Sequence, residues 1–287
     1  MTDKALEGLR VVDLTHHIAG PFCTRLMADL GAEVIKVEKP GSGDPARRTG
    51  PFAGNSPDPD HSIPFLYYNF NKKGITLNLK TPEGLDILKR LLQKVDILVE
   101  NFEPRVLPGL GLDYKTLENL NPGLILTSIS NFGQTGPYRD HKATDLVSYA
   151  LGGMLFITGA YDREPVKHGL SQAQILAGLN AAVGTLTARY WQRVSGQGQH
   201  VDVSIMESVV GMQGPHPVSY SYTGGILRRQ TATWGGTHRI APCLSPLLEG
   251  GSRTWEEFTA FIEMEETTPD SATLPADSFT ATNYTPY

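Results

Sequence analysis

The sequence has 287 residues, a formal net charge of −5 and an ordinary apolar content of 40%. A chain of this length holds one large domain or two modest ones and has ample material for a core. Its negative charge argues against a general nucleic-acid binder and against an anionic-membrane binder, because both need a basic surface. An anionic ligand would therefore have to be held by a local cluster of cations.

The N-terminal residues carry no apolar signal core, and no apolar run is long enough to cross a bilayer. We therefore expect a cytoplasmic protein that binds neither membrane nor nucleic acid. Its two cysteines, Cys23 and Cys243, are too few for a disulfide framework and too isolated for a zinc site. We expect both to be buried thiols, and no metal site.

The first forty residues predict a strand, a helix and a second strand. Residues 9–14 and 34–37 are short apolar runs rich in β-branched side chains, and between them apolar residues recur at helical spacing from Gly20-Pro21 onward. Gly31 stands where a glycine would end the helix. The two strands should be parallel neighbours joined by a right-handed crossover.

Ligands bind such sheets where strands end and helices begin, which places residues 15–20 at a ligand-binding edge. Helix-start N–H groups there would suit a phosphate. An ordinary dinucleotide fold is the alternative, and Glu38 occupies the place of its ribose-binding acid. However, the loop offers only Gly20 in place of G-x-G-x-x-G and has His16 and His17 where small residues are needed. The pattern favours a nucleotide other than a nicotinamide one.

Residues 40–64 are rich in polar and turn-forming residues and predict a surface loop beside this site. Arg47 and Arg48 in that loop could hold a phosphate or a carboxylate, although an exposed basic pair is more often simply solvated.

Strands and helices then alternate along the chain. We predict a turn over residues 71–74, strands over 75–79, 96–100 and 124–130, and helices from Thr81 and over 114–119. Two longer helical patterns cover residues 145–155 and 172–191, and the second is rich in small residues that permit close packing. The fold class is therefore α/β, a Rossmann-like, mostly parallel sheet with helices on both faces.

Six segments, taken together and in this order, resemble successive motifs of the family III CoA-transferases. They are LEGLRVVDLTHHIAGPFCTRLMADLGAEVIKVEKPGSGD, YNFNKKGITLNLKTPEG, DILVENFEP, SISNFGQTGPYRD, ATDLVSYALGGML and SGQGQHVDVSIMES. The resemblance runs from about residue 6 to about residue 246. It implies a Rossmann-like large domain, a smaller second domain and two chains interlocked as a homodimer.

The resemblance also implies that coenzyme A binds at the strand ends as a substrate, with no tightly bound cofactor. Positions matching the family's CoA-contacting residues are His16, Ile18, Ala19, Lys39, Asn69, Asn71, Lys72, Asn101, Phe102 and Lys142. Family members carry an arginine after the N-F-x-P motif, where this chain has Pro108-Gly109, and Arg105 is the nearest substitute.

The position of the family's catalytic nucleophile is occupied here by a glutamine. In the family an aspartate four residues before a helix glycine attacks the acyl-CoA thioester, whereas counting back from Gly178 gives Gln174. A neutral amide cannot act as a carboxylate nucleophile. Three interpretations follow: a pseudoenzyme that still binds CoA, a branch that uses another carboxylate, and a partner for an intact subunit.

Asp145 is the best local substitute for that nucleophile, although an Asp after Thr144 suits the first turn of a helix, and we favour that role. Glu164 and Glu207 are weaker candidates. His16 and His17 could form a base pair, but loop histidines beside a nucleotide more often bind than catalyse.

The C-terminal region departs from the family pattern, which continues for about one further domain-sized piece. We expect residues 1–200 to form the CoA-binding large domain, 201–264 a linker and partial small domain, and 265–287 a disordered tail, because that stretch is rich in Thr, Ser and Pro. A natural short form, a truncated fragment and a shifted reading frame all fit this ending.

The function predicted from the sequence is transfer of coenzyme A between an acyl-CoA donor and a free carboxylic acid, in a cytoplasmic homodimer. Two alternatives stay open: a catalytically silent CoA-binding or dimerisation module, and a racemase-like acyl-CoA enzyme. Nothing in the sequence names the acid.

Overall fold

The parallel β-sheet at the centre of the fold has six strands in the order β3-β2-β1-β4-β5-β6. A computed structural model describes residues 4–55, 57–159, 163–214, 216–226 and 229. The strands are β1 Arg10–Asp13, β2 Glu33–Glu38, β3 Lys73–Thr76, β4 Ile97–Glu100, β5 Ile125–Ser130 and β6 His200–Ser204. Every pairing between neighbouring strands is parallel, as predicted.

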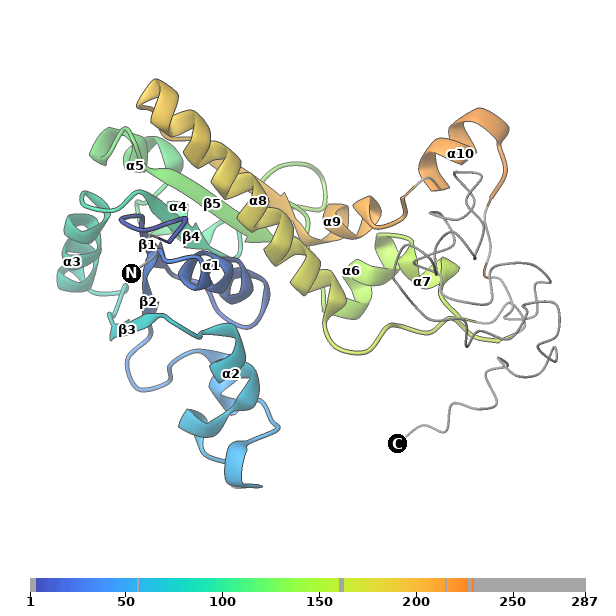
Figure 1. The fold of residues 1–287 in the computed structure, drawn as a ribbon, viewed down its shortest axis with the longest axis horizontal. Helices are drawn as coiled ribbons and strands as arrows, with labels where there is room; N and C mark the ends of the chain where they lie inside the picture. The colour runs from blue at the N-terminus through green and yellow to red at the C-terminus, as the bar shows by residue number, and fades with distance from the viewer. Residues whose placement is uncertain (1–3, 56, 160–162, 215, 227–228, 230–287) are drawn as a thin grey trace, which may run out of the picture. The chain divides into compact units, whose positions relative to one another are not determined.

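Helices cover both faces of the sheet (Figure 1). Those of the described residues are α1 Ala19–Asp29, α2 Ile63–Tyr68, α3 Pro82–Leu92, α4 Val106–Gly109, α5 Tyr114–Leu120, α6 Asp145–Leu151, α7 Met154–Ile157, α8 Gln172–Ser195, α9 Ile205–Gly211 and α10 His216–Thr223. Short 3-10 helices occupy Pro45–Arg48, Ala53–Asn55 and Pro59–His61 within the predicted surface loop. The sequence therefore predicts the α/β class correctly.

One face of the sheet carries an aliphatic core under α3, α4 and α5. Val12, Leu98 and Leu126, from three neighbouring strands, pack there with leucines of the three helices. Such burial of aliphatic surface stabilises the fold by about 25 cal/mol for each Å² removed from water. The same packing also holds in place the edge of the sheet at which these strands end.

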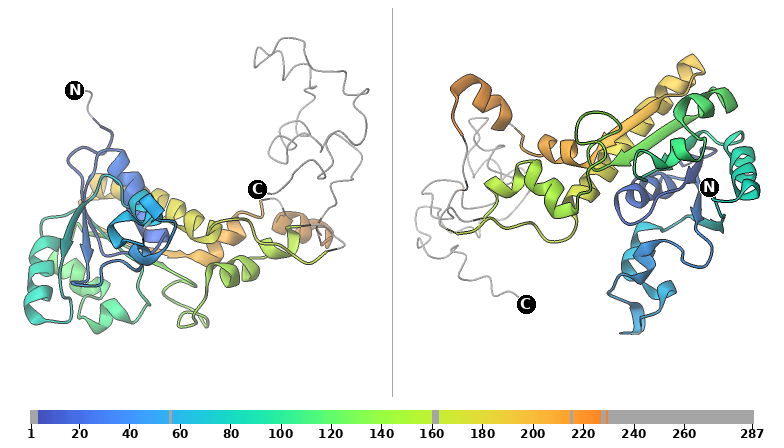
Figure 2. Two further views of the ribbon diagram at one scale, coloured as in Figure 1. Left: turned by 90° about the horizontal axis from the view of Figure 1, so that it is seen from below. Right: turned by 180° about the vertical axis from the view of Figure 1, so that it is seen from behind.

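The other face carries α1 and the long helix α8, which pack against each other, and α8 runs alongside β5 (Figure 2). The predicted small residues make this close approach possible, because Ala173, Ala177 and Ala181 are fully buried. At Gly178 a side chain would not fit, since an added Cβ would lie 2.4 Å from the Ala19 carbonyl oxygen.

The predicted bounds of three elements are wrong by more than one residue. The strand predicted over 75–79 is β3, which begins at Lys73, inside the turn predicted over 71–74, and ends at Thr76 because its partner β2 ends at Glu38, in register with Thr76. The helix predicted over 145–155 ends at Leu151, since Gly152 and Gly153 follow and Gly153 has a φ of 85°. The helix predicted over 172–191 continues to Ser195, where Gly196, with a φ of 74°, ends it.

The chain divides into two units. One contains residues 4–155 and 167–225 as far as they are described, including the whole sheet, and the described residues of the other are 156–159, 163–166, 226 and 229. Within the second unit, the Arg229 guanidinium donates hydrogen bonds to the carbonyl oxygens of Phe156 and Arg163. The tail predicted over 265–287 lies outside the described residues, as does Cys243.

Candidate functional site

A cavity of about 520 Å³ lies at the carboxyl edge of the sheet, in the first unit. Its lining comes from the residues after β1 and β2, from the loop before α3, and from the segment after β4. The crossovers run in opposite directions on the two sides of β1, which makes this the topological switch point of the sheet. The ligand edge predicted from the sequence is therefore hollow in the structure.

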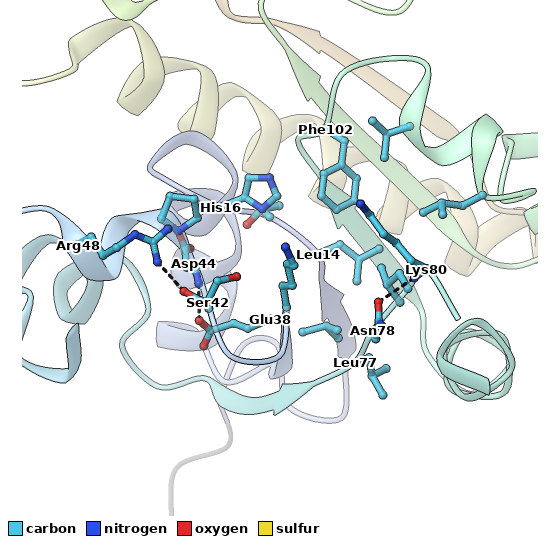
Figure 3. A pocket seen from close by; sticks show the side chains of 18 residues that line it. Leu14, His16, Glu38, Ser42, Asp44, Arg48, Leu77, Asn78, Lys80 and Phe102 are labelled. Atoms are coloured by element: carbon cyan, nitrogen blue, oxygen red, sulfur yellow. Dashed lines mark hydrogen bonds between the residues drawn. The ribbon is translucent and has the colours of Figure 1, made fainter. Parts of the chain in front are cut away.

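Three cationic side chains and a group of apolar side chains line the cavity. Lys39 follows β2, Arg48 ends the 3-10 helix Pro45–Arg48, and Lys80 precedes α3. Arg48 and Lys80 lie on opposite sides of the cavity, and Lys80 extends toward Phe102 (Figure 3). The apolar wall is made by Leu77, Leu79, Phe102, Val106 and Leu110. Cations beside an apolar wall suit a ligand that carries both phosphates and a flat ring.

Asp13, at the end of β1, holds the loop that forms the back of the cavity. The carboxylate accepts hydrogen bonds from the Thr15 N–H at 2.8 Å, from the hydroxyls of Thr15 and Thr24, and from Lys72 Nζ at 3.0 Å. Burial opposes ionisation, but the attraction of Lys72 and Lys36 and the hydroxyl bonds outweigh it, so the pKa of Asp13 lies well below its usual range. The loop after β1 is thus anchored on a buried charge.

A second buried ion pair fixes the same loop from β2. Lys36 Nζ lies 2.9 Å from an Asp44 carboxylate oxygen and donates to the Thr15 carbonyl oxygen at 2.8 Å. Asp44 in turn accepts the His17 N–H at 3.0 Å, where the backbone has a φ of 65°. Close packing adds to this anchoring, since a Cβ at Gly20 would lie 2.3 Å from the Thr15 side chain.

Asn101, the residue after β4, clamps the backbone of His16. Its amide nitrogen donates to the His16 carbonyl oxygen at 2.7 Å, and its amide oxygen accepts the His16 N–H at 2.9 Å. The His16 ring lies 5.0 Å from the Phe102 ring, centroid to centroid. Burial lowers the pKa of His16, so at neutral pH a neutral imidazole faces the cavity.

Of the two arginines in the surface loop, only Arg48 is exposed toward the cavity. Arg47 donates to both carboxylate oxygens of Glu38 at 2.8 Å and to Asp60 at 2.7 Å, and it stacks on the Phe65 ring. Burial opposes ionisation of Glu38, but the bonds from Arg47 and the Asp44 N–H outweigh it and lower the pKa of Glu38. Arg47 therefore neutralises the acid that a dinucleotide fold would offer to a ribose.

The structure brings together part of the predicted CoA-binding set. His16, Lys39 and Phe102 line the cavity, and Asn101 positions His16. Ile18 and Ala19 start α1 beside the cavity but do not line it. Lys142 is exposed and lies 3.6 Å from Glu103, outside the cavity lining.

The predicted residues of the asparagine turn support α1 and do not line the cavity. Lys72 is buried, and its ammonium donates to Asp13, to the Pro21 carbonyl oxygen and to the Asn69 amide oxygen. Asn71 donates to Asp29 at 2.7 Å. In this arrangement Lys72 uses its three N–H groups within the protein and holds the loop after β1 in place.

The two predicted catalytic positions are neighbours at the start of α8. One Asp145 carboxylate oxygen accepts the Gln174 N–H at 3.1 Å, and the other lies 3.0 Å from Lys167 Nζ. Asp145 is also in the first turn of α6, whose N-cap is Thr144, in keeping with the favoured structural role. Neither Asp145 nor Gln174 lines the strand-end cavity.

Sequence reasoning missed Ser42, Asn78 and Lys80 as lining residues. The sequence did indicate Asn78 and Lys80, because both lie between a parallel strand and Thr81, the N-cap of α3. Connections from a strand to the next helix lie at the carboxyl edge of a parallel sheet. The prediction placed Asn78 inside a strand and so hid the loop.

Within the part of the chain that the structure describes, no group of three or more His, Cys, Asp or Glu side chains could hold a metal ion, and no helix is long and apolar enough to span a membrane. Cys23 is a buried free thiol, and burial raises its pKa far above the usual range.

Comparison with known proteins points to one family. Residues 6–276 match CoA-transferase family III. The chain is 42% identical to a succinyl-CoA–D-citramalate CoA-transferase of Chloroflexus aurantiacus, over 85% of this chain and 58% of that protein. It is 39% identical to a succinyl-CoA:glutarate CoA-transferase of Mus musculus, over 82% of this chain and 52% of that protein. The chain thus spans little more than half the length of these relatives.

Solved structures give the same result. A CAIB/BAIF family protein from Brucella suis superimposes with a TM-score of 0.75 at 35% identity, over 80% of this chain and 61% of that one. A hypothetical protein from Mycobacterium tuberculosis superimposes with a TM-score of 0.70 at 30% identity, over 78% and 60% of the two chains.

Proposed function

The chain belongs to CoA-transferase family III, and from that premise we propose that it binds coenzyme A and moves it between an acyl-CoA thioester and a free carboxylic acid. The strand-end cavity is the proposed site for the nucleotide half of CoA. Coenzyme A enters and leaves as a substrate, and the proposal requires no further tightly bound cofactor.

One observation carries the proposal: Lys39, Arg48 and Lys80 line the same cavity as the apolar side chains of Leu77, Leu79, Phe102, Val106 and Leu110. The phosphates of CoA need cations, and its adenine needs an apolar surface such as that of Phe102. A chain with a net charge of −5 offers such a cationic cluster only locally.

The proposed acceptor is a short dicarboxylic acid. The relatives are named for citramalate and glutarate as acceptors and for succinyl-CoA as donor. Exchange between two thioesters of similar energy needs no external energy source, so CoA, donor and acceptor suffice for the reaction.

A second candidate function is a silent CoA-binding module, and Gln174 is the observation that favours it. An amide cannot open a thioester as a carboxylate does. The neighbouring carboxylate of Asp145 is held by the Gln174 N–H and by Lys167, which stabilises its charge and weakens it as a nucleophile.

The test is a CoA-transfer assay from succinyl-CoA to glutarate and to citramalate, run on the native chain, on Gln174→Asp and on Gln172→Asp. Gln172→Asp is the matched control, since it adds the same charge to the first turn of α8 at a position other than that of the nucleophile. Calorimetric titration with CoA on the same samples measures binding separately from transfer.

Transfer by the native chain supports the enzyme and excludes the silent module. Transfer by Gln174→Asp alone, with CoA binding by all three proteins, supports the silent module. Absence of CoA binding in all three contradicts both candidate functions.

We also propose a cytoplasmic homodimer. Exposed apolar side chains follow one stripe of α8, namely Leu179, Val183, Tyr190, Trp191 and Val194, and such a surface is typical of a protein interface. Light scattering during gel filtration measures the mass directly, and a monomer at assay concentration contradicts the proposal.

A further inference from the structure

A row of polar side chains crosses the sheet next to the nucleotide cavity. Glu100, Ser128 and Asp202 are in register on β4, β5 and β6, with Glu100 at the carboxyl end of β4 and the other two within two residues of the ends of their strands. In-register residues of parallel strands point to the same face, and His200, two residues before Asp202, shares it. Glu100 and Ser128 are buried, at 3% and 2% exposure.

Three of these groups form a hydrogen-bonded chain from the buried carboxyl group to an exposed ring. The Ser128 hydroxyl bonds to Glu100, and His200 Nε2 lies 2.9 Å from the same hydroxyl oxygen. Tyr114 stacks on the His200 ring at 5.3 Å between centroids, which fixes its orientation. A small cavity of about 60 Å³, lined by these polar groups and by Leu107, Leu112 and Leu126, lies along this hydrogen-bonded row.

Ser128 has only one hydroxyl proton. When Glu100 changes charge, donor and acceptor must therefore exchange roles in both hydrogen bonds of Ser128. With Glu100 ionised, Ser128 donates to the carboxylate and accepts the Nε2–H of His200. With Glu100 neutral, its O–H donates to Ser128, Ser128 donates to Nε2, and the imidazole proton resides on Nδ1. One proton enters at Nδ1 for each proton that reaches Glu100, so charge and atoms balance.

The surroundings favour the neutral form of Glu100. Burial, together with Asp202, raises the pKa of Glu100 to about 7, against hydrogen bonds from Ser128 and the Phe102 N–H. Lysine and arginine are absent from the described lining of the small cavity, and the titratable groups that face Glu100 are Glu103, Asp113, Tyr114, His200 and Asp202. The carboxyl group therefore changes charge near neutral pH with no cation beside it.

Glu100 also acts on the nucleotide cavity through the backbone. Its carboxylate accepts the Phe102 N–H at 2.8 Å. Phe102 lines the cavity, and Asn101, between the two residues, clamps His16. A charged acceptor holds an N–H about twice as strongly as a neutral one.

We propose that Glu100 is a proton-gated positioning residue that exchanges its proton with solvent through Ser128 and His200 and thereby tightens or loosens the Asn101–Phe102 wall of the nucleotide cavity. This inference rests on the proposed binding of CoA at that cavity. The ionised form holds the wall, so CoA binds more tightly as the pH rises through neutrality.

The experiment is calorimetric titration of the full chain with CoA from about pH 6 to about pH 8.5. Three proteins are compared: the native chain, Glu100→Gln, whose amide oxygen still accepts the Phe102 N–H but cannot ionise, and Glu118→Gln, an exposed control on α5. Titration of the CoA phosphate and of His16 changes the affinity for CoA of all three proteins alike. Across this pH range, we expect the affinity for CoA of the native chain and of Glu118→Gln to rise roughly fivefold more than that of Glu100→Gln.

A second measurement uses the native chain alone. The amide proton of Phe102, followed by NMR across the same pH range, should shift with a midpoint near 7, the pKa of Glu100. Ser128→Ala removes the donor to the carboxylate and should move that midpoint to higher pH.

Equal pH profiles for the native chain and Glu100→Gln overturn the inference, as does a Phe102 amide shift that is flat through neutrality. Failure of CoA to bind at any pH instead contradicts the proposed function, and the Phe102 titration then still decides whether Glu100 switches.

Discussion

Replacing Asp13 by Asn tests how the loop behind the nucleotide cavity is held. Asp13 is fully buried, and Lys72, its partner at 3.0 Å, is 2% exposed. The substitution leaves the shape nearly unchanged but removes the negative charge. Burial lowers the pKa of Lys72 to about 8 even with Asp13 beside it, and loss of the Asp13 charge lowers that pKa further, so in the variant Lys72 loses either its counter-charge or its proton.

Breaking a buried ion pair by removing one partner costs about 3–5 kcal/mol, because the other charge stays buried and uncompensated. At a typical urea dependence of about 2–3 kcal/mol/M for a domain of this size, the unfolding midpoint of Asp13→Asn should fall by roughly 1–2 M. The double variant Asp13→Asn/Lys72→Met should recover part of this loss, since it removes the stranded charge as well.

Urea unfolding followed by circular dichroism at pH 7 measures both changes. Glu33→Gln is the control, because its pair with Lys73 is exposed and should leave the midpoint unchanged. The reasoning fails if Asp13→Asn unfolds at the native midpoint, or if Asp13→Asn/Lys72→Met unfolds at a lower urea concentration than Asp13→Asn alone.

Two further predictions concern the packing of α8 and the titration of Glu100. Gly178→Ala should lower the free energy of unfolding by about 1–3 kcal/mol, because its Cβ would meet the Ala19 carbonyl oxygen. The control Gly211→Ala has open space around it and should not destabilise the chain. Equal urea midpoints for the two variants would refute this prediction. Glu100 has a folded pKa of about 7 against an ordinary 4.5, so its stabilising contribution is complete below about pH 4.5 and is lost as the pH rises through 7. At about 1.4 kcal/mol per pH unit, the native chain should lose about 3 kcal/mol relative to Glu100→Gln across that window, and parallel stability curves for the two proteins would contradict the assignment.

Much of the strand and helix pattern was readable from the sequence, because strands such as β4 are short apolar runs and helices such as α3, α5 and α6 begin with a capping side chain. Thr81 and Pro82 begin α3 as expected, and the small residues of α8 meet α1 as expected. The errors in the predicted bounds arise from the tertiary structure. β3 stops where β2 stops pairing, and α6 stops at Leu151, before Gly152 and Gly153, of which Gly153 has a φ of 85°.

The candidate site was predictable in place but only partly in composition. Parallel strand ends locate the cavity and the loop that holds His16, whereas Lys39 and Phe102 were predicted from the family resemblance. Which cations stay available could not be read from sequence, because it depends on partners distant along the chain. Arg47 pairs with Glu38 and Lys72 pairs with Asp13, whereas Lys80 lines the cavity.

The measurement that tests the central claim most directly is the affinity for CoA of the native chain beside Arg48→Met, Lys80→Met and the control Arg90→Met. Arg90 is an exposed cation on α3 that does not line the cavity. If the strand-end cavity holds the phosphates of CoA, loss of either lining cation should weaken binding by about tenfold or more and reduce its salt dependence, with Arg90→Met unchanged. If all four proteins bind CoA equally, the cavity is not the CoA site.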